Sequence, residues 1–270
     1  MSGYKTGFFA VFFFLFSFSV SSYAGEKVTR HVSAGVGYAL YGMRDLGLSP
    51  LHYDGDHIFL TTSLQRHTGK AISIAEVSFM NGRISPDINP LLTTAEMKSM
   101  KLYIHYSYYR YTGSILNNAR LYLGGSTLLH SASYRHNLFI NSSINLNTIN
   151  SLNLSGMISL PFAVNEREHL LELHLQAPVA AFIVRPSYAY IKPSGFLDHS
   201  SGGLESIFRS IEVATVDRFF SLNSGVSLKY SLRNNSALRI CYRWEYMEHS
   251  GDNPFNSATH GIVLQTIFTL

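Results

Sequence analysis

Residues 238–246 read Leu-Arg-Ile-Cys-Tyr-Arg-Trp-Glu-Tyr, and their side chains alternate between two classes. One class is apolar or aromatic, at Leu238, Ile240, Tyr242, Trp244 and Tyr246, and the other is charged or small. Period two indicates a β-strand, because successive side chains leave opposite faces of the backbone. A strand that is apolar on one side and charged on the other fits the wall of a membrane β-barrel, which separates lipid from a polar lumen.

The same alternation recurs along the whole chain. Expected strands cover residues 31–40, 58–67, 71–84, 100–109, 120–130, 152–162, 171–183, 219–232, 238–246 and 261–270. Several of them reach the nine to eleven residues that a tilted strand needs to cross a bilayer. We therefore predict an all-β fold, a transmembrane antiparallel up-and-down β-barrel of about ten strands. Eight and twelve strands are the alternatives.

The N-terminus is predicted to lie outside this fold. Lys5 precedes an almost wholly apolar run over residues 8–20, and Ser22-Tyr23-Ala24 places small residues where a signal peptidase reads them. This is the pattern of a secretory signal peptide. We expect a signal peptide over residues 1–24 and one barrel domain over residues 25–270, and no later apolar run is long enough for a membrane helix.

Composition supports the same fold class. The chain is 46% hydrophobic but only 14% charged, against about 25% charged residues in ordinary soluble domains. A single cysteine, Cys241, excludes an intrachain disulfide. The formal net charge of +4 is spread without a basic run, so no nucleic-acid partner is predicted.

Three places are expected to depart from regular strands. Residues 43–56 and 186–217 are predicted loops; within the second, Leu204, Ile207, Phe208 and Ile211 fall at helical spacing. The apolar parity changes inside residues 71–84, which predicts a β-bulge near Ala75. Pro178 interrupts the alternation of residues 171–183, so a bulge or weak pairing is expected there, with Ile183 facing outward.

The C-terminal strand Gly261–Leu270 resembles the closing strand of integral outer-membrane β-barrel proteins of Gram-negative bacteria, with Phe268 two residues before the end. The resemblance covers nearly all of residues 27–270. It implies export to the cell outer membrane, contact with outer-membrane lipid, and the barrel-assembly machinery as a partner during biogenesis.

Two motifs are candidates for chemistry. His105-Tyr106-Ser107 has the spacing found in outer-membrane phospholipases and lipid A deacylases, with Asn117 or Asn118 as the nearby orienting group. Its parity with Lys101 points it inward, however, whereas that resemblance implies a site open to the membrane.

The second candidate is residues 52–57, which read His-Tyr-Asp-Gly-Asp-His. They loosely resemble the Asp/His site of ten-stranded outer-membrane proteases, and the same groups suit a divalent cation. Asp-Gly pairs are also ordinary turn chemistry, so a solvated loop is the expected reading.

The inward charges form the principal predicted site. A narrow barrel fills its lumen with side chains, and buried charges must be paired. The expected lumen network comprises Lys101, Arg120, Glu172, His174, Lys229, Arg239, Arg243 and Glu245. Within it, we expect Arg239, Arg243 and Glu245 to join Glu172.

We predict no catalysis, no cofactor and no metal. The expected role is a structural or accessory component that docks to a larger envelope assembly. The alternative is a narrow, porin-like, weakly anion-preferring channel, since basic rings attract anions. A lipid hydrolase using His105 and Ser107 is the remote alternative.

Overall fold

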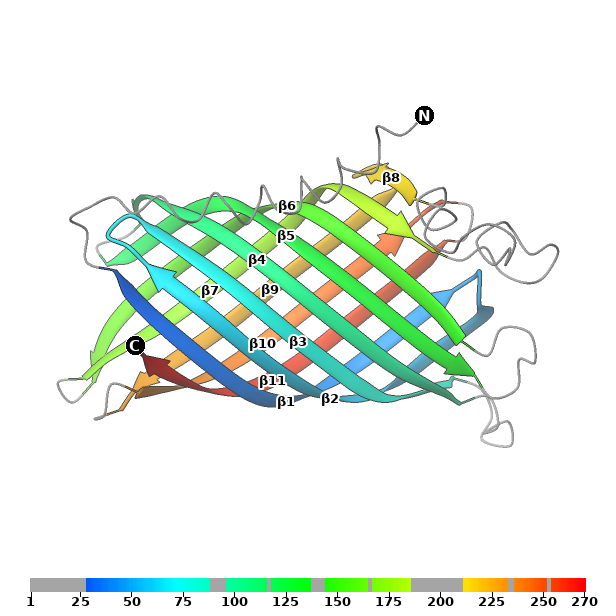
Figure 1. Ribbon diagram of the computed structural model, residues 1–270, viewed down its shortest axis with the longest axis horizontal. Helices are drawn as coiled ribbons and strands as arrows, with labels where there is room; N and C mark the ends of the chain where they lie inside the picture. Colours follow the sequence, from blue (N-terminus) through cyan, green and yellow to red (C-terminus); the bar gives the residue numbers. More distant parts are fainter. Residues whose placement is uncertain are drawn as a thin grey trace, which may run out of the picture.

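The computed structural model describes residues 28–87, 96–115, 118–136, 144–164, 167–185, 211–232, 236–251 and 254–270. This part of the chain is almost entirely β-strand and contains no helix (Figure 1). The strands are β1 (Thr29–Asp45), β2 (Ser49–His67), β3 (Ala71–Pro86), β4 (Met97–Ile115), β5 (Ala119–His136), β6 (Ile144–Val164), β7 (Arg167–Val184), β8 (Ile211–Thr215), β9 (Phe219–Ser231), β10 (Ser236–His249) and β11 (Phe255–Thr269).

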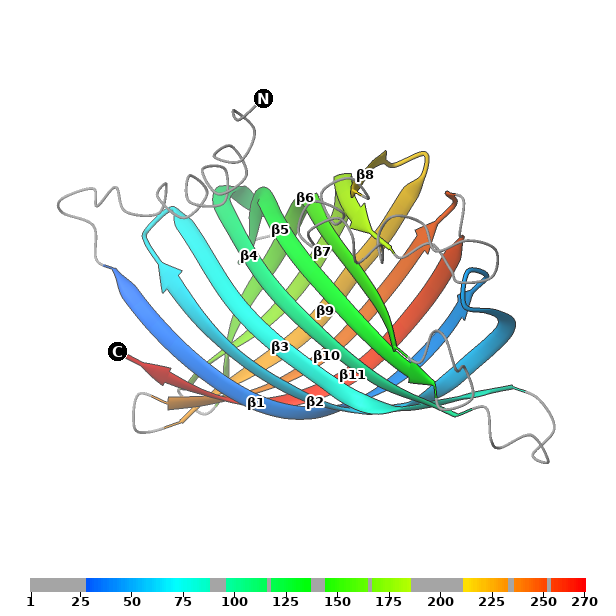
Figure 2. The ribbon, with the colours of Figure 1, turned by 45° about the vertical axis from the view of Figure 1, so that its right-hand side comes forward.

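Ten of these strands close into a barrel. Each strand from β1 to β7 pairs antiparallel with the next, β9 follows β7, and the β1–β11 pairing completes the cylinder (Figures 1 and 2). The strand β8 is a short addition beside the end of β7. We call the end where β1 begins and β11 finishes the terminal end, and the opposite end the loop end. The predicted ten-stranded antiparallel barrel is confirmed.

Closure also explains how such a chain satisfies its backbone in lipid. Every wall strand has a neighbour on both sides, so the backbone is paired around the barrel apart from a short unpaired stretch between β7 and β9. The β1–β11 ladder is continuous from His31 opposite Thr269 to Asp45 opposite Phe255.

The two faces of the wall differ as the alternation predicted. Leu154 on the outer face is 67% exposed, whereas its neighbour Asn153 is 5% exposed and faces the lumen. Outward apolar side chains that are more than a third exposed occur on every wall strand, among them Val36, Leu60, Val77, Ile104, Leu123, Leu152, Leu173, Leu228, Ile240 and Leu264. The outer surface is therefore apolar around the whole circumference.

The expected loop over residues 43–56 is wrong. β1 continues to Asp45 and β2 already begins at Ser49. A tight turn joins them, in which Leu48 N donates to Asp45 O at 2.9 Å and Gly47 N donates to Asp45 Oδ1 at 3.1 Å. Polar and glycine residues resembled a loop because the hairpin continues beyond the apolar belt, with His52, Asp54 and Asp56 on its outer face.

The expected bulge near Ala75 is also wrong. β3 pairs without a register shift with both β2 and β4. Ile72 and Ile74 face inward with Glu76, Ser78 and Met80. The parity appeared to change because this part of the lumen is lined by apolar residues as well as polar ones.

At Pro178 the ladder is interrupted as predicted. Asn153 of β6 pairs with Pro178 while Leu152 pairs with Ala180, so one residue of β7 is extra. The extra residue reverses the faces that follow it. Ile183 consequently faces the lumen and is 1% exposed, which contradicts its predicted outward position.

The wall between β7 and β9 is interrupted at the same height. Their pairing ends at Gln176 opposite Asn223, and β7 pairs next with β8, from Ala180 opposite Thr215. In between, Arg218 N donates to Thr215 O at 2.9 Å in a turn. We call residues 177–179 of β7 and 219–222 of β9, between which no strand pairing occurs, the β7–β9 seam.

The rest of the predicted 186–217 loop is only partly described. Leu204, Ile207 and Phe208 lie outside the described residues, and Ile211 is the first residue of β8 rather than part of a helix. The signal peptide prediction for residues 1–24 likewise lies outside them. Among the described residues, no helix meets the length and apolarity needed to span a bilayer.

Candidate functional site in the barrel lumen

Inward side chains from opposite walls meet inside the barrel. Toward the loop end, the Tyr41 hydroxyl of β1 lies 2.7 Å from the Tyr134 hydroxyl of β5. The Lys101 ammonium lies 2.8 Å from the centroid of the Tyr41 ring. This cation–π contact stabilises a positive charge that is removed from water. An apolar cluster fills the space beside them, comprising Met43, Tyr53, Ile84, Met97 and Ala132.

At the loop end itself, Asp45 of β1 and Arg185 beyond β7 form an ion pair with a nitrogen–oxygen distance of 2.6 Å. The Arg185 guanidinium also lies over the Phe255 ring at 4.4 Å. Burial raises the pKa of the Asp45 carboxyl, and the charge of Arg185 opposes that shift. The pair joins two walls above the apolar cluster.

In the middle of the lumen, Arg243 of β10 binds Glu76 of β3. Its two terminal nitrogens lie 2.5 and 2.7 Å from the two carboxylate oxygens. Ser78 Oγ donates to the same carboxylate at 3.0 Å and lies 2.9 Å from Thr61 Oγ1, whose hydroxyl can donate to it. Such a two-pronged guanidinium–carboxylate contact fixes both orientation and distance.

A second charged pair lies nearer the terminal end. Arg239 Nη2 is 3.6 Å from Glu172 Oε2 and donates to Gln65 Oε1 at 3.2 Å. Ser227 donates to Glu172 at 3.3 Å, and His174 Nε2 lies 3.9 Å from the same carboxylate. Beyond this level, Ile72, Tyr109, Tyr122 and Met157 form an apolar cluster toward the terminal end.

The structure therefore brings most of the predicted lumen residues together, but with different partners. Arg239 reaches Glu172 as expected, whereas Arg243 pairs with Glu76 instead. Glu245 accepts a hydrogen bond from Tyr103 at 3.3 Å rather than joining Glu172. The expected joint network of Arg239, Arg243, Glu245 and Glu172 is wrong in that respect.

The two remaining predicted members of the lumen network lie at its edge. Lys229 is half-buried and faces Arg239 across the β9–β10 ladder. Arg120 is exposed near the start of β5, opposite Ser159, so it lies at the rim of the terminal end rather than in the network.

Glu76 is the principal residue that sequence reasoning missed. The signal was present, because a carboxylate in mid-strand cannot face hydrocarbon. That single charge assigns the inward face of β3, and with it the inward positions of Ile72 and Ile74.

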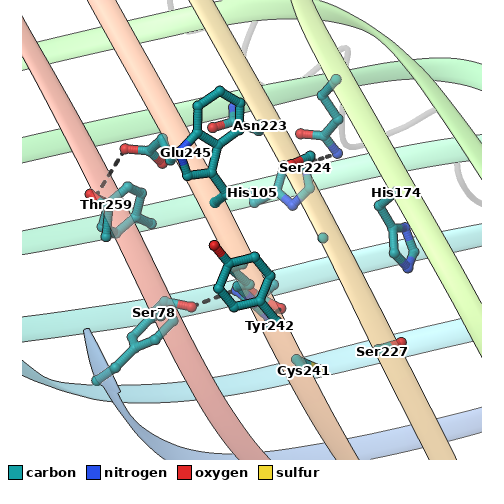
Figure 3. A pocket seen from close by; sticks show the side chains of 18 of the residues that line it. Ser78, His105, His174, Asn223, Ser224, Ser227, Cys241, Tyr242, Glu245 and Thr259 are labelled. Atoms are coloured by element: carbon teal, nitrogen blue, oxygen red, sulfur yellow. Dashed lines mark hydrogen bonds and ion pairs between the residues drawn. The ribbon is translucent and has the colours of Figure 1, made fainter. Parts of the chain in front are cut away.

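A cavity of about 180 Å³ lies between the two charged pairs. Figure 3 shows His105, His174, Asn223 and Glu245 around it. On the two neighbouring strands, Arg243 is paired with Gly225 and Gly261. These glycines have no side chains to cover the inner face of the wall beside Arg243. The cavity also has an apolar side, formed by Phe59, Ile74, Met80 and Leu128.

Solved structures with a similar fold are outer-membrane proteins. The outer-membrane protease OmpT from Escherichia coli matches 91% of this chain and 97% of its own, with a TM-score of 0.51 and 8% identity. The chain has the fold of an integral outer-membrane β-barrel. The translocator domain of the autotransporter NalP from Neisseria meningitidis matches 91% of this chain and 90% of its own, with a TM-score of 0.45 and 10% identity. At these identities the likeness extends to the fold alone.

Sequence comparisons add no closer relationship. No protein-family model matches the chain, and no curated protein matches it in sequence.

Inside the barrel, His105 and Ser107 do meet. The Ser107 hydroxyl lies 2.8 Å from His105 Nε2, and Gln176 Nε2 lies 3.1 Å from the same nitrogen. Both face the lumen as their parity predicted, and Ser107 is 0% exposed. Of the two candidate orienting groups, Asn118 is exposed in the β4–β5 turn and Asn117 lies outside the described residues. These hydrogen bonds link β4 to β7 across the lumen.

The His52–His57 motif does not converge on one point. Because these residues lie on β2, His52 and Asp54 face outward and pair at 3.0 Å. His57 faces the lumen, with its ring 5.4 Å from that of Tyr41. Within the described ranges, no group of three or more histidine, cysteine or acidic side chains is placed to hold a metal ion.

Proposed function

We propose that this barrel is a closed, non-catalytic component of the outer membrane, a structural or accessory subunit that docks to a larger envelope assembly. The observation that carries the proposal is that side-chain contacts bridge opposite walls at successive heights. Tyr41–Tyr134 joins β1 to β5, Arg243–Glu76 joins β10 to β3, and Gln176–His105 joins β7 to β4.

These bridges work against conduction. A pore needs a continuous wet path, whereas here apolar clusters lie toward both ends of the polar middle layer. The contacts across the lumen also brace the cylinder, as expected of a barrel whose interior is filled by side chains.

The narrow channel is the second candidate. It is supported by the cavity and by the basic side chains of Arg239, Arg243 and Lys229 along β9 and β10. A single layer of this kind would give a weak preference for anions.

Conductance measurements distinguish the closed barrel from the narrow channel. In planar bilayers we expect no stepwise current from the wild-type barrel, and current from a Tyr41→Ala/Tyr134→Ala variant that removes the contact across the loop end. Tyr38→Ala is the matched control, because Tyr38 lies on the outer face of the same strand. Wild-type steps that shrink in Arg239→Glu would overturn the closed barrel in favour of the channel.

Docking is tested by site-specific photo-crosslinking in cells. A photoreactive residue at Leu46, exposed at the tip of the β1–β2 hairpin, should give a discrete protein adduct. The same residue at Leu154, on the lipid-facing wall, should give none. Absence of an adduct at Leu46 and at further loop-end positions would argue against an accessory subunit.

The absence of catalysis is tested directly. We expect the purified barrel to leave phospholipid and lipopolysaccharide acyl chains intact. Hydrolysis that disappears in Ser107→Ala and persists in Ser126→Ala, another buried lumen serine, would contradict the proposal.

A further inference from the structure

The central cavity combines two chemical surfaces. One side is apolar and the other carries Arg239, Gln176 and Asn223. Its volume of about 180 Å³ is that of roughly six waters. A polar headgroup with the first few carbons of a chain fits such a space, but a whole lipid does not.

Charge in this layer is unbalanced. Among the described residues in and beside the cavity, Lys101, Lys229, Arg239 and Arg243 stand against Glu76, Glu172 and Glu245. With neutral histidines, one positive charge has no counterpart. The excess charge is that of Lys229, which is half-buried and pairs with Arg239 in the ladder, so an anion bound at Arg239 would be attracted by both cations.

Arg239 offers a place for that anion. Its side chain is 7% exposed, and its Nε is a buried donor without a hydrogen-bond partner. Only Nη2 is engaged, by Gln65 and more loosely by Glu172. A carboxylate suits a guanidinium donor of this kind, because it accepts charge-assisted hydrogen bonds in the same plane.

Along the barrel axis, buried apolar clusters lie on either side of the cavity. The wall itself, however, is interrupted beside the cavity. Gln176 and Asn223 line the cavity and are also the last β7–β9 pair before the β7–β9 seam. Pro178, inside the seam, has no N–H with which to restore the ladder.

From these features we infer that the cavity is a binding site for a single-chain anionic amphiphile, which enters sideways from the membrane through the β7–β9 seam. Its carboxylate binds Arg239, and its chain leaves through the seam into lipid. Phe219 and Ser221, both buried on the inner side of the seam, must move aside for entry. This site is compatible with the proposed closed barrel, because it requires no path along the axis.

The first test measures affinity with the barrel in lipid nanodiscs. Radiolabelled hexadecanoate should bind with one site per barrel, and Arg239→Gln should weaken binding about tenfold or more, the loss expected for one charge-assisted hydrogen bond. Arg218→Gln, an exposed arginine in the β8–β9 turn, is the matched control and should bind as wild type. Labelled butanoate, which shares the carboxylate but lacks the membrane-seeking chain, should bind far more weakly.

The second test closes the β7–β9 seam with an engineered disulfide. In a Cys241→Ala background, an Ala177→Cys/Leu222→Cys disulfide should slow hexadecanoate binding at least tenfold, and reduction should restore it. The control disulfide Leu173→Cys/Val226→Cys joins directly paired residues of the same two strands and should have no effect.

Three results would overturn the inference: no saturable hexadecanoate binding, equal binding of butanoate, or a seam lock without effect on the rate. None of them bears on conductance, so failure of this site and failure of the closed-barrel proposal are separate outcomes.

Discussion

Two charged pairs share one lumen and are held very differently. Arg243 and Glu76 make two contacts of 2.5 and 2.7 Å between walls four strands apart. Arg239 approaches Glu172 only to 3.6 Å, beyond hydrogen-bond range, across the single intervening strand β9. The first pair makes two direct contacts across the lumen, whereas in the second the Nε donor of Arg239 has no hydrogen-bond partner.

The two arginines also have different neighbours in the wall. Arg243 lies between Gly225 and Gly261, so no side chain on either adjacent strand obstructs its path across the lumen. Arg239 lies between Lys229 and Gln265, and its Nη2 reaches Gln65 of β2, three strands away, at 3.2 Å. The two glycines therefore leave room beside Arg243 for its two-pronged contact with Glu76.

The largest effect should come from removing the anion of the Arg243–Glu76 pair. Glu76→Gln leaves Arg243 without its counter-charge, and breaking a buried pair in this way typically costs about 3–5 kcal/mol. We expect a loss near the lower bound, because Arg243 is partly exposed to the cavity. Urea titration of the barrel in lipid vesicles measures it, with fluorescence of the only tryptophan, the outward-facing Trp244, as the reporter.

The control for this prediction is Glu248→Gln. Glu248 is an exposed, outward-facing carboxylate near the loop end of the same strand as Arg243, and it should change stability by less than about 0.5 kcal/mol. Equal losses in the two variants would show that the Arg243–Glu76 contact does not brace the barrel.

A second change sharpens the comparison by removing both charges. Glu76→Gln/Arg243→Met should recover most of the stability lost in Glu76→Gln, because an uncompensated charge no longer remains buried. The measurement is a double-mutant cycle on the same urea titrations. Additive losses, without a coupling energy above about 0.5 kcal/mol, would mean that the two residues act independently.

Removing the carboxylate of the looser pair, Arg239 and Glu172, should destabilise the barrel less. Glu172→Gln removes a carboxylate that is not hydrogen-bonded to Arg239, and Gln65 still accepts from that arginine. We expect a loss of about 1–2 kcal/mol, within the range for ordinary buried polar changes. A loss larger than that of Glu76→Gln would reverse the ranking of the two pairs.

The sequence was sufficient to predict the wall. Leu154 and Asn153 illustrate why: a period of two assigns each side chain to lipid or lumen from its immediate neighbours alone. The failures at residues 71–84 and 43–56 have local causes. Ile72 and Ile74 are apolar yet inward, and the polar residues around Asp54 belong to a hairpin that extends past the apolar belt.

Pairing across the lumen could not be predicted in the same way. Which residue of β3 meets Arg243 depends on the stagger of four intervening strand pairs, and no feature within either strand encodes it. The inward position of Ile183 could not be predicted from the sequence for a similar reason. Pro178 predicted an interruption, but the side to which later residues point depends on whether a residue is inserted there.

The smallest expected effect concerns the neutral contact at the loop end. Tyr134→Phe removes only the hydroxyl that meets Tyr41 at 2.7 Å and leaves the ring in its apolar cluster. One neutral hydrogen bond contributes about 1 kcal/mol, so the loss should fall below that of either charge variant. Tyr108→Phe, on the outer face, is the control and should cost less. If Tyr134→Phe instead matched Glu76→Gln, the apolar end of the lumen rather than its charged middle would hold the walls together, and the difference between the two arginine pairs would matter little for stability.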